Sequence, residues 1–413
     1  MNDLFVAGVG MTAFGRHADQ SLYDLARRAI AAALQDAGAE ASEVQAAYYA
    51  GATNGPLQGQ YSIPGPIALR RAGIEGVAVF SVENACASGS SAFHLAATAL
   101  KAGACDIALA VGAEKMNIAD KSRMLGVFDS GWDLSAGQAN RATLLALGAG
   151  IEPPPGSQSE RPYSVFMDVY AAFCRQHMRR YGTTQRQIAA VAAKNHRHSV
   201  HNPLAQFREA YSIEQVLAAP PITYPLTLPM CSAISDGAAA ALLCTAEGLK
   251  RLNGRVGRAV RLRASVVLTG IDHDADEREK GIGWRCAARA YEMAGVDPCD
   301  IDLAEVHDAT AMGELLNAEA LRLVPFGDAG AAAERGEFTV GGRIPINPSG
   351  GLESKGHPIG ATGLGQIHEL VTQLRGEAGP RQVEGARLAV QENGGGLIGI
   401  EEAVVAVNVF SRI

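Results

Sequence analysis

The stretch VENACASGSS holds a cysteine, Cys86, with the surroundings of a nucleophile. It follows an apolar run and directly precedes a helix predicted over residues 87–100. A thiol at a helix N-terminus gains from the helix dipole and from unpaired backbone N–H groups, and both favour the reactive thiolate. The alternative is a small buried cysteine that only packs, because free cysteines are often buried.

The stretch SKGHPIGATG offers a base for this thiol. His357 follows a glycine suited to a tight turn and precedes a second predicted helix, so its imidazole would project from a helix start. A cysteine paired with a histidine is the usual way to activate a nucleophilic thiol. A histidine that only bonds to the backbone at a helix start is the alternative.

Two further stretches stand at the ends of predicted strands, where α/β proteins build their sites. His307 and Asp308 follow a strand predicted over residues 303–306, and a solvated turn is the alternative for them. The stretch QENGGGLIG, residues 391–399, contains three glycines that allow close backbone approach and expose N–H groups, which suits an oxyanion hole. A phosphate cradle is the rival interpretation, although no Walker lysine follows.

Three histidines at positions 196, 198 and 201 form the stretch NHRHSVH. Their spacing matches no standard zinc pattern, and no acidic partner stands nearby in the sequence. We therefore predict a solvated basic helix end here and no metal ligand.

Composition narrows the class of protein. The 413 residues carry a net charge of −7, which argues against a nucleic-acid binder but still allows a phosphate-bearing small ligand. No apolar run reaches the length of a membrane span, and the first residues lack the pattern of a signal peptide. The seven cysteines include no CxxC pair, so we expect reduced thiols and a cytoplasmic location.

Short strand-like runs alternate with helical stretches through most of the chain, which predicts an α/β fold. A helix is expected over residues 21–37, with Ser21 as its N-cap and Gly38 as its stop. The predicted strands of the first half cover residues 4–8, 44–49, 77–82 (a run of the buried type) and 107–111.

The second half of the chain repeats this plan. An offset of 257 residues aligns the Ala-Gly pair at 37–38 with the Ala-Gly pair at 294–295. An offset of 271 aligns Cys86 with His357, each in a turn of small residues that enters a helix. Two similar halves would place equivalent strand ends side by side, so the repeat predicts that this cysteine and this histidine meet.

The repeat also divides the chain. We predict one half from residues 1–116 and 235–270 and a second half from residues 271–413. The stretch between them, residues 117–234, contains PPPG, clustered histidines and arginines and several prolines, and we interpret it as an inserted loop domain.

Five stretches together resemble the thiolase superfamily, in particular its sterol-carrier/lipid-transfer type: NACASG, LPMCSAISDGAAAA, EVHDA, NPSGGLESKGHPIGATG and QENGGG. The resemblance covers nearly the whole chain. It implies a five-layered αβαβα fold built from two similar halves with a loop domain over the active site. It also implies homodimers or tetramers, and acyl-thioesters of coenzyme A as substrates, with no permanently bound cofactor.

The resemblance assigns roles to individual residues. Cys86 would take up the acyl group, and His357 would activate this thiol and help to hold a thioester oxygen. His307 stands where most of the superfamily has the asparagine of the NEAF loop. The backbone N–H groups of Cys86 and Gly394 would form the oxyanion hole. Coenzyme A would be contacted by Ser232, at the position of a serine that touches the pantetheine arm, and by Asn393 in the glycine loop.

The chain departs from the family at the second catalytic cysteine, which acts as acid and base. The two places where thiolases carry it are occupied here by Glu392 and Ala309. We expect Glu392 or His307 to supply the missing function, because a carboxyl near a dry thioester site gains a raised pKa that suits general acid work.

The leading hypothesis is therefore a thiolase-like acyltransferase that acts on 3-ketoacyl-CoA through an acyl-cysteine. One alternative transfers the acyl group to a carbon nucleophile, and another is a retro-aldolase of a CoA thioester. Either would work with a small zinc-ribbon/OB-fold partner subunit. A lipid- or acyl-CoA-binding protein without catalysis is the non-enzymatic alternative.

Overall fold

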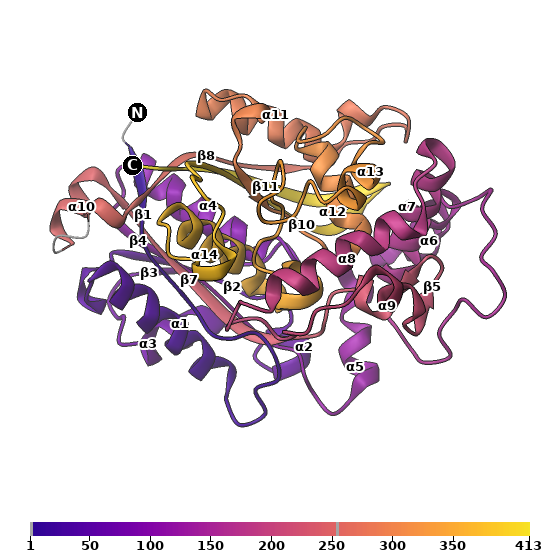
Figure 1. Cartoon of the computed structure of the whole chain (residues 1–413). Helices are drawn as coiled ribbons and strands as arrows, with labels where there is room; N and C mark the ends of the chain where they lie inside the picture. The colour runs from indigo at the N-terminus through magenta and orange to yellow at the C-terminus, as the bar shows by residue number, and fades with distance from the viewer. Residues whose placement is uncertain (1–2, 253–255) are drawn as a thin grey trace.

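A nine-stranded mixed sheet forms the centre of the computed structural model, which describes residues 3–252 and 256–413 (Figure 1). The strands, in sheet order, are β3 (Ala78–Val82), β2 (Ala46–Ala50), β4 (Ile107–Lys115), β7 (Asp236–Thr245), β1 (Leu4–Met11), β8 (Val260–Thr269), β11 (Glu401–Arg412), β10 (Leu388–Ile398) and β9 (Leu303–Glu305). The strands of the two predicted halves join where β8 pairs with β11.

Helices cover this sheet in layers. The helices α4 (Ser88–Lys101) and α14 (Thr362–Leu374) form the middle layer and pack against strands of both halves in one buried apolar cluster. Figure 1 shows α1 (Leu22–Ala37) and α11 (Ile282–Ala294) on opposite outer sides, each over one half of the sheet. The predicted five-layered αβαβα fold is thus confirmed.

The remaining helices complete the outer layers and the connections. They are α2 (Asn54–Gln58), α3 (Pro64–Arg71), α5 (Lys121–Gly126), α6 (Gly137–Ala146), α7 (Val165–Tyr181), α8 (Gln185–Ser199), α9 (Ile213–Ala218), α10 (Ala246–Arg251), α12 (Ala311–Ala320) and α13 (Ala329–Glu334).

The sequence repeat has a structural counterpart. The repeated Ala-Gly pairs end α1 and α11, and their glycines, Gly38 and Gly295, adopt φ values of 67° and 65°. This left-handed conformation suits glycine, because it lacks a Cβ. The glycines that follow Cys86 and His357 by three positions lie against each other: a Cβ on Gly89 would come within 2.8 Å of the Gly360 carbonyl oxygen.

Most predicted elements of the first half lie within a few residues of their expected positions, and Ser21 caps α1 through a capping box. The run 77–82 is the exception in burial. It forms β3 at the edge of the sheet, where among the described strands it pairs only with β2; Phe80 is 53% exposed and stacks on Tyr48. An edge strand lacks one neighbour, which explains why an apolar run is exposed there.

Residues 117–234 contribute α5 to α9 and a separate two-stranded sheet of β5 (Pro221–Thr223) and β6 (Leu226–Thr227). Neither of these two strands joins the nine-stranded sheet. The division of the chain at residues 116, 234 and 270 stays a prediction. No helix in the described part of the chain is long and apolar enough to cross a membrane.

The prediction of a solvated helix end around the three histidines was wrong for two of them. His196 and His198 are buried on α8, because this helix packs under the segment that leads to His357. The His198 Nδ1–H donates to the Asn347 carbonyl, and Nε2 accepts the backbone N–H of Val340. Burial and nearby Lys194 lower the pKa of His198 to about 3, and burial lowers that of His196 to about 4.

Candidate active site

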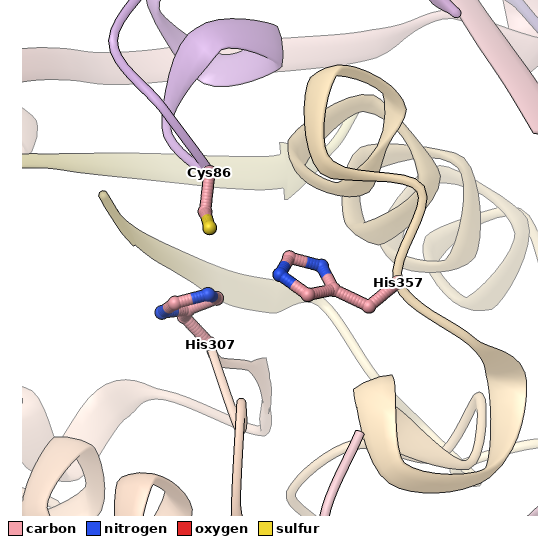
Figure 2. A group of neighbouring side chains, drawn as sticks. All are labelled: Cys86, His307 and His357. Carbon is pink, nitrogen blue, oxygen red and sulfur yellow. The ribbon is translucent and has the colours of Figure 1, made fainter. Parts of the chain in front are cut away.

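Three side chains from distant parts of the chain converge in the centre of the molecule, as Figure 2 shows for Cys86, His307 and His357. The thiol sulfur and one nitrogen of each ring lie within 4.8 Å of one another, and the two ring centroids are 5.4 Å apart. A cavity of about 330 Å³ opens beside them. The meeting of Cys86 with His357, predicted from the repeat, is confirmed.

A tight turn presents the half-buried cysteine ahead of α4. The residue before it, Ala85, adopts φ 47°, a left-handed conformation that a non-glycine residue holds only when its surroundings enforce it. The Ser88 hydroxyl enforces it from both sides, since it accepts the Asn84 N–H and donates to the Ala85 carbonyl. A Cβ at Gly395 would overlap the backbone of this turn, so β10 can pass beneath it only with a glycine there.

His357 is held as a neutral base. Its backbone N–H donates to the Ser235 hydroxyl at 2.9 Å, and its Nδ1 lies 2.7 Å from the Thr362 hydroxyl oxygen. Since that hydroxyl donates its own proton to the Pro358 carbonyl, it accepts the Nδ1–H, and Nε2 keeps its lone pair. Burial and the neighbouring His307 lower the pKa of His357 well below its usual value.

His307 has the opposite electrostatic setting. Its Nδ1–H donates to the Glu402 carboxylate at 3.1 Å, and Nε2 has no hydrogen-bond partner among the described residues. Burial disfavours the charged ring, but the neighbouring Cys86 thiol and Glu402 carboxylate outweigh it and raise the pKa of His307 well above its usual value. The protonated form of His307 is thus favoured beside the His357 ring, whose neutral form is favoured.

Two titratable groups with pKa values driven apart commonly mark the acid and the base of a site. Here the neutral His357 can accept the proton of the Cys86 thiol, and the charged His307 can donate one. The arrangement therefore supplies a nucleophile, a base and an acid within one cavity.

The predicted residues of the glycine strand lie behind the cavity, and none of Glu392, Asn393 and Gly394 is among its lining residues. Glu392 is fully buried and accepts the His307 backbone N–H at 3.0 Å; burial and Glu402 raise its pKa well above the usual value. The Asn393 side-chain oxygen accepts the Ser90 hydroxyl. A Cβ at Gly394 would overlap the Glu402 carboxylate.

The lining of the cavity also contains Ser232, Ala309 and Cys231. The Ser232 backbone N–H donates to the Ala309 carbonyl at 3.0 Å, which fixes both residues at the cavity. Cys231 matches no catalytic motif of the family in the sequence, yet it lines the same cavity, with its thiol donating to the Thr227 carbonyl. The roles of Ser232 and Asn393 toward coenzyme A stay predictions.

Sequence reasoning missed Glu402, which lines the cavity and lies at the start of β11. Its surroundings, GIEEAV, match no motif, so the only available signal was its place just after the glycine stretch. The apolar walls were missed as well. They include Leu125, Val127, Phe128, Phe166, Met167, Tyr170, Ile222 and Leu228.

A second, smaller cavity of about 170 Å³ lies on the far side of Glu402. Three residues, Glu402, Tyr170 and Leu397, line both cavities and form the wall between them. The Glu402 side chain is 20% exposed.

Comparison with known families decides the identity. Residues 4–213 match the model of the thiolase N-terminal domain, and residues 281–408 match the thiolase C-terminal domain-like model. The chain belongs to the thiolase family. As a member of this family, the chain is an acyl-CoA acyltransferase of the thiolase type.

This thiolase resembles curated proteins over most of its length. It is 38% identical to sterol carrier protein 2 of Homo sapiens over 97% of this chain and 71% of that protein. It is 37% identical to acetyl-CoA acetyltransferase of Methanothermobacter thermautotrophicus, with 100% of both chains covered. It is 33% identical to benzoylsuccinyl-CoA thiolase subunit BbsB of Thauera aromatica, over 92% of this chain and 91% of that one.

A solved structure confirms the fold of this thiolase. The Ltp2-ChsH2(DUF35) aldolase matches it with a TM-score of 0.78 over 99% of this chain and 98% of that one, at 24% identity. The predicted resemblance to thiolases of the lipid-transfer type is thus confirmed by the family models and the relatives together.

Proposed function

We propose that this thiolase transfers acyl groups from 3-ketoacyl-CoA or acyl-CoA thioesters through a covalent acyl group on Cys86. The observation that carries the proposal is the pairing of the Cys86 thiol with the neutral His357, whose Nδ1–H is fixed by Thr362. This fixed tautomer leaves Nε2 free to accept the thiol proton.

The first step follows from this geometry. His357 takes the thiol proton as the Cys86 sulfur attacks the keto carbon of the substrate. The Cys86 backbone N–H and an N–H of the glycine strand would bind the developing oxyanion; Gly395 and Gly396 line the cavity, whereas Gly394, which we expected in this role, does not. The carbon–carbon bond then breaks, the acyl group stays on sulfur, and the enolate of the shortened thioester leaves.

The enolate requires a proton, and incoming coenzyme A must lose one. The two positions where thiolases carry the second cysteine are occupied by Glu392 and Ala309. We therefore assign this acid and base function to His307, whose ring faces Cys86 and whose pKa is raised. Coenzyme A then takes the acyl group and restores the thiol. It is substrate and product in this scheme, and no permanently bound cofactor takes part.

The cavity walls support an acyl substrate. Most of the apolar side chains that line the cavity come from residues 117–234, which suits the acyl part of a thioester, and Ser232, which also lines it, would contact the pantetheine arm. The assembly as a homodimer or tetramer is proposed from the family resemblance.

Product analysis by mass spectrometry tests this function. The chain is incubated with coenzyme A and a panel of 3-ketoacyl-CoA thioesters, and the shortened acyl-CoA products are measured. We expect turnover by the wild type and a loss of about 10⁴-fold or more in Cys86→Ala, because the nucleophile is removed. Unchanged turnover in Cys86→Ala would contradict the acyl-cysteine.

A second candidate function is favoured by the missing second cysteine and by the relative named as a thiolase subunit. Here the chain would transfer the acyl group to a carbon nucleophile, or cleave a CoA thioester as a retro-aldolase, together with a small zinc-ribbon/OB-fold partner. Retro-aldol cleavage does not use the thiol, so activity that survives Cys86→Ala identifies it. Acylation of Cys86 without turnover of any 3-ketoacyl-CoA favours the specialised acceptor.

A further inference from the structure

We propose that Glu402 is the positioning residue that keeps His307 charged, so that the Glu402–His307 pair replaces the missing second cysteine. The proposal rests on the proposed acyl transfer and names the residue that makes its acid step work. It differs from the sequence expectation, which gave the carboxyl role to Glu392.

The contacts of the His307 ring carry the proposal. The Glu402 carboxylate accepts the Nδ1–H at 3.1 Å, and the His307 side chain is 4% exposed and the Glu402 side chain 20% exposed. Accepting this proton fixes Nδ1 as a donor, and the second proton of the imidazolium must then sit on Nε2. That nitrogen has no other hydrogen-bond partner among the described residues, and the ring faces the thiol.

The fold reserves space for this carboxylate. Glu402 is the second residue of β11, the return strand of the hairpin of β10 and β11, and pairs with Leu397. From there its side chain reaches back over Gly394, where any Cβ would overlap it. A glycine at position 394 is therefore required for the carboxylate to reach His307.

The two rival groups are less well placed. Glu392 contacts the backbone N–H of His307, does not line the cavity, and is favoured in its uncharged form by burial. Cys231 lines the cavity but its thiol is engaged with Thr227, and burial raises its pKa well above the usual value. Neither can deliver a proton as directly as His307 Nε2.

The proton balance of the reaction closes with this pair. As the carbon–carbon bond breaks, the Nε2 proton passes to the enolate carbon, and His307 becomes neutral with its Nδ1–H still bound to Glu402. The thiol of incoming coenzyme A then gives its proton to Nε2 while its sulfur attacks the acyl-Cys86 carbonyl. Cys86 leaves as a thiolate and recovers its proton from His357.

Several charged or titratable groups lie around the His307 ring and together determine its protonation. They are Cys86, His357, Glu402, Glu392, Asp308 and Tyr170. Among the carboxyl groups, only Glu402 bonds to the ring itself in the described structure.

The test measures the titration of His307 in the whole chain by ¹⁵N NMR of labelled histidine, with His307→Asn to assign the signal. In Glu402→Gln we expect the His307 midpoint to fall by about 1–3 pH units, because an opposite charge within hydrogen-bonding distance is lost. The alkaline limb of the kcat profile should fall by the same amount, and Glu402→Asp should restore part of the shift. In the matched change Glu392→Gln, both midpoints should move much less.

An unmoved His307 midpoint in Glu402→Gln, or an equal shift in Glu392→Gln, would overturn the proposal. Loss of turnover in Cys231→Ser, with the Glu402→Gln limb unmoved, would assign the acid to Cys231. The NMR titration does not need turnover. A shifted His307 midpoint in Glu402→Gln, with no acylation of Cys86 in the wild type, would therefore reject the proposed function and leave the Glu402 proposal standing. Acylation with an unmoved midpoint rejects the Glu402 proposal alone.

Discussion

The substitution Gly394→Ala tests the pairing of Glu402 with His307 without touching either side chain. The added Cβ would overlap the Glu402 carboxylate, which is the end of a flexible side chain, whereas Gly394 is paired with Val405 of β11, so we expect the side chain to give way rather than the strand. The backbone N–H groups of the glycine strand are retained. The perturbation therefore acts on the 3.1 Å contact between Glu402 and His307.

The expected magnitude follows from the lost ion pair. Removing an opposite charge at this distance lowers a histidine pKa by about 1–3 units, and we take about 2 units as the central value. His307 has a raised pKa, so its charged form, and with it the rate, is lost as pH rises through that value. At pH values above the His307 pKa of both proteins, a pKa shift of about 2 units makes the mutant about 100-fold slower than the wild type. At pH values well below both pKa values, the two rates converge.

The assay is kcat against pH for wild type and Gly394→Ala on the same 3-ketoacyl-CoA, with thermal unfolding as the check on folding. The matched control is Gly395→Ala, where the Cβ would meet the backbone of the nucleophile turn instead of a movable side chain. We expect that control to lose stability or activity at every pH. A slower Gly394→Ala enzyme with an unmoved alkaline limb would refute the reasoning and point to the oxyanion hole.

Three further predictions concern the two histidine environments. At pH 7 iodoacetamide should label Cys86 faster than the exposed Cys299, and His357→Asn should remove this advantage; equal rates in the wild type would contradict the pairing. Thr362→Val should lower kcat/KM by up to about tenfold by freeing the His357 tautomer, with Thr362→Ser restoring it, and an unaffected valine variant would contradict that role. Because the folded-state pKa of His198 is about 3, its contribution to stability is present above pH 6.5 and is lost as pH falls toward 3. The free energy of unfolding, measured in urea at several pH values, should change with pH by about 1.4 kcal/mol per pH unit less in His198→Asn than in the wild type within this window. An equal pH dependence of the two proteins would contradict this prediction.

The halves of the fold were predictable because the repeat carries physical constraints. Gly38 and Gly295 end equivalent helices in a left-handed conformation, and small residues let α4 and α14 begin side by side. The requirements for glycine and for small residues at these positions are visible in the sequence as residue types at fixed offsets. The convergence of Cys86 and His357 followed from them.

Burial and charge were less predictable, because they depend on neighbours distant in sequence. The strand β3 has an apolar sequence but lies at an edge, and His198 has a polar sequence context but is covered by the segment of Asn347. Glu402 matches no motif, and its role depends on a hairpin that brings it over Gly394. Glu392 was the better candidate by alignment, and only the fold shows that it lies behind His307.

The most direct test of acyl transfer through Cys86 is intact-protein mass spectrometry after brief incubation with a panel of acyl-CoA and 3-ketoacyl-CoA thioesters. We predict a mass gain equal to one acyl group, located on Cys86 by peptide mapping and lost in Cys86→Ala. Its size will identify the acyl class. No adduct from any thioester, or an adduct of the same size in Cys86→Ala, would contradict the acyl-cysteine.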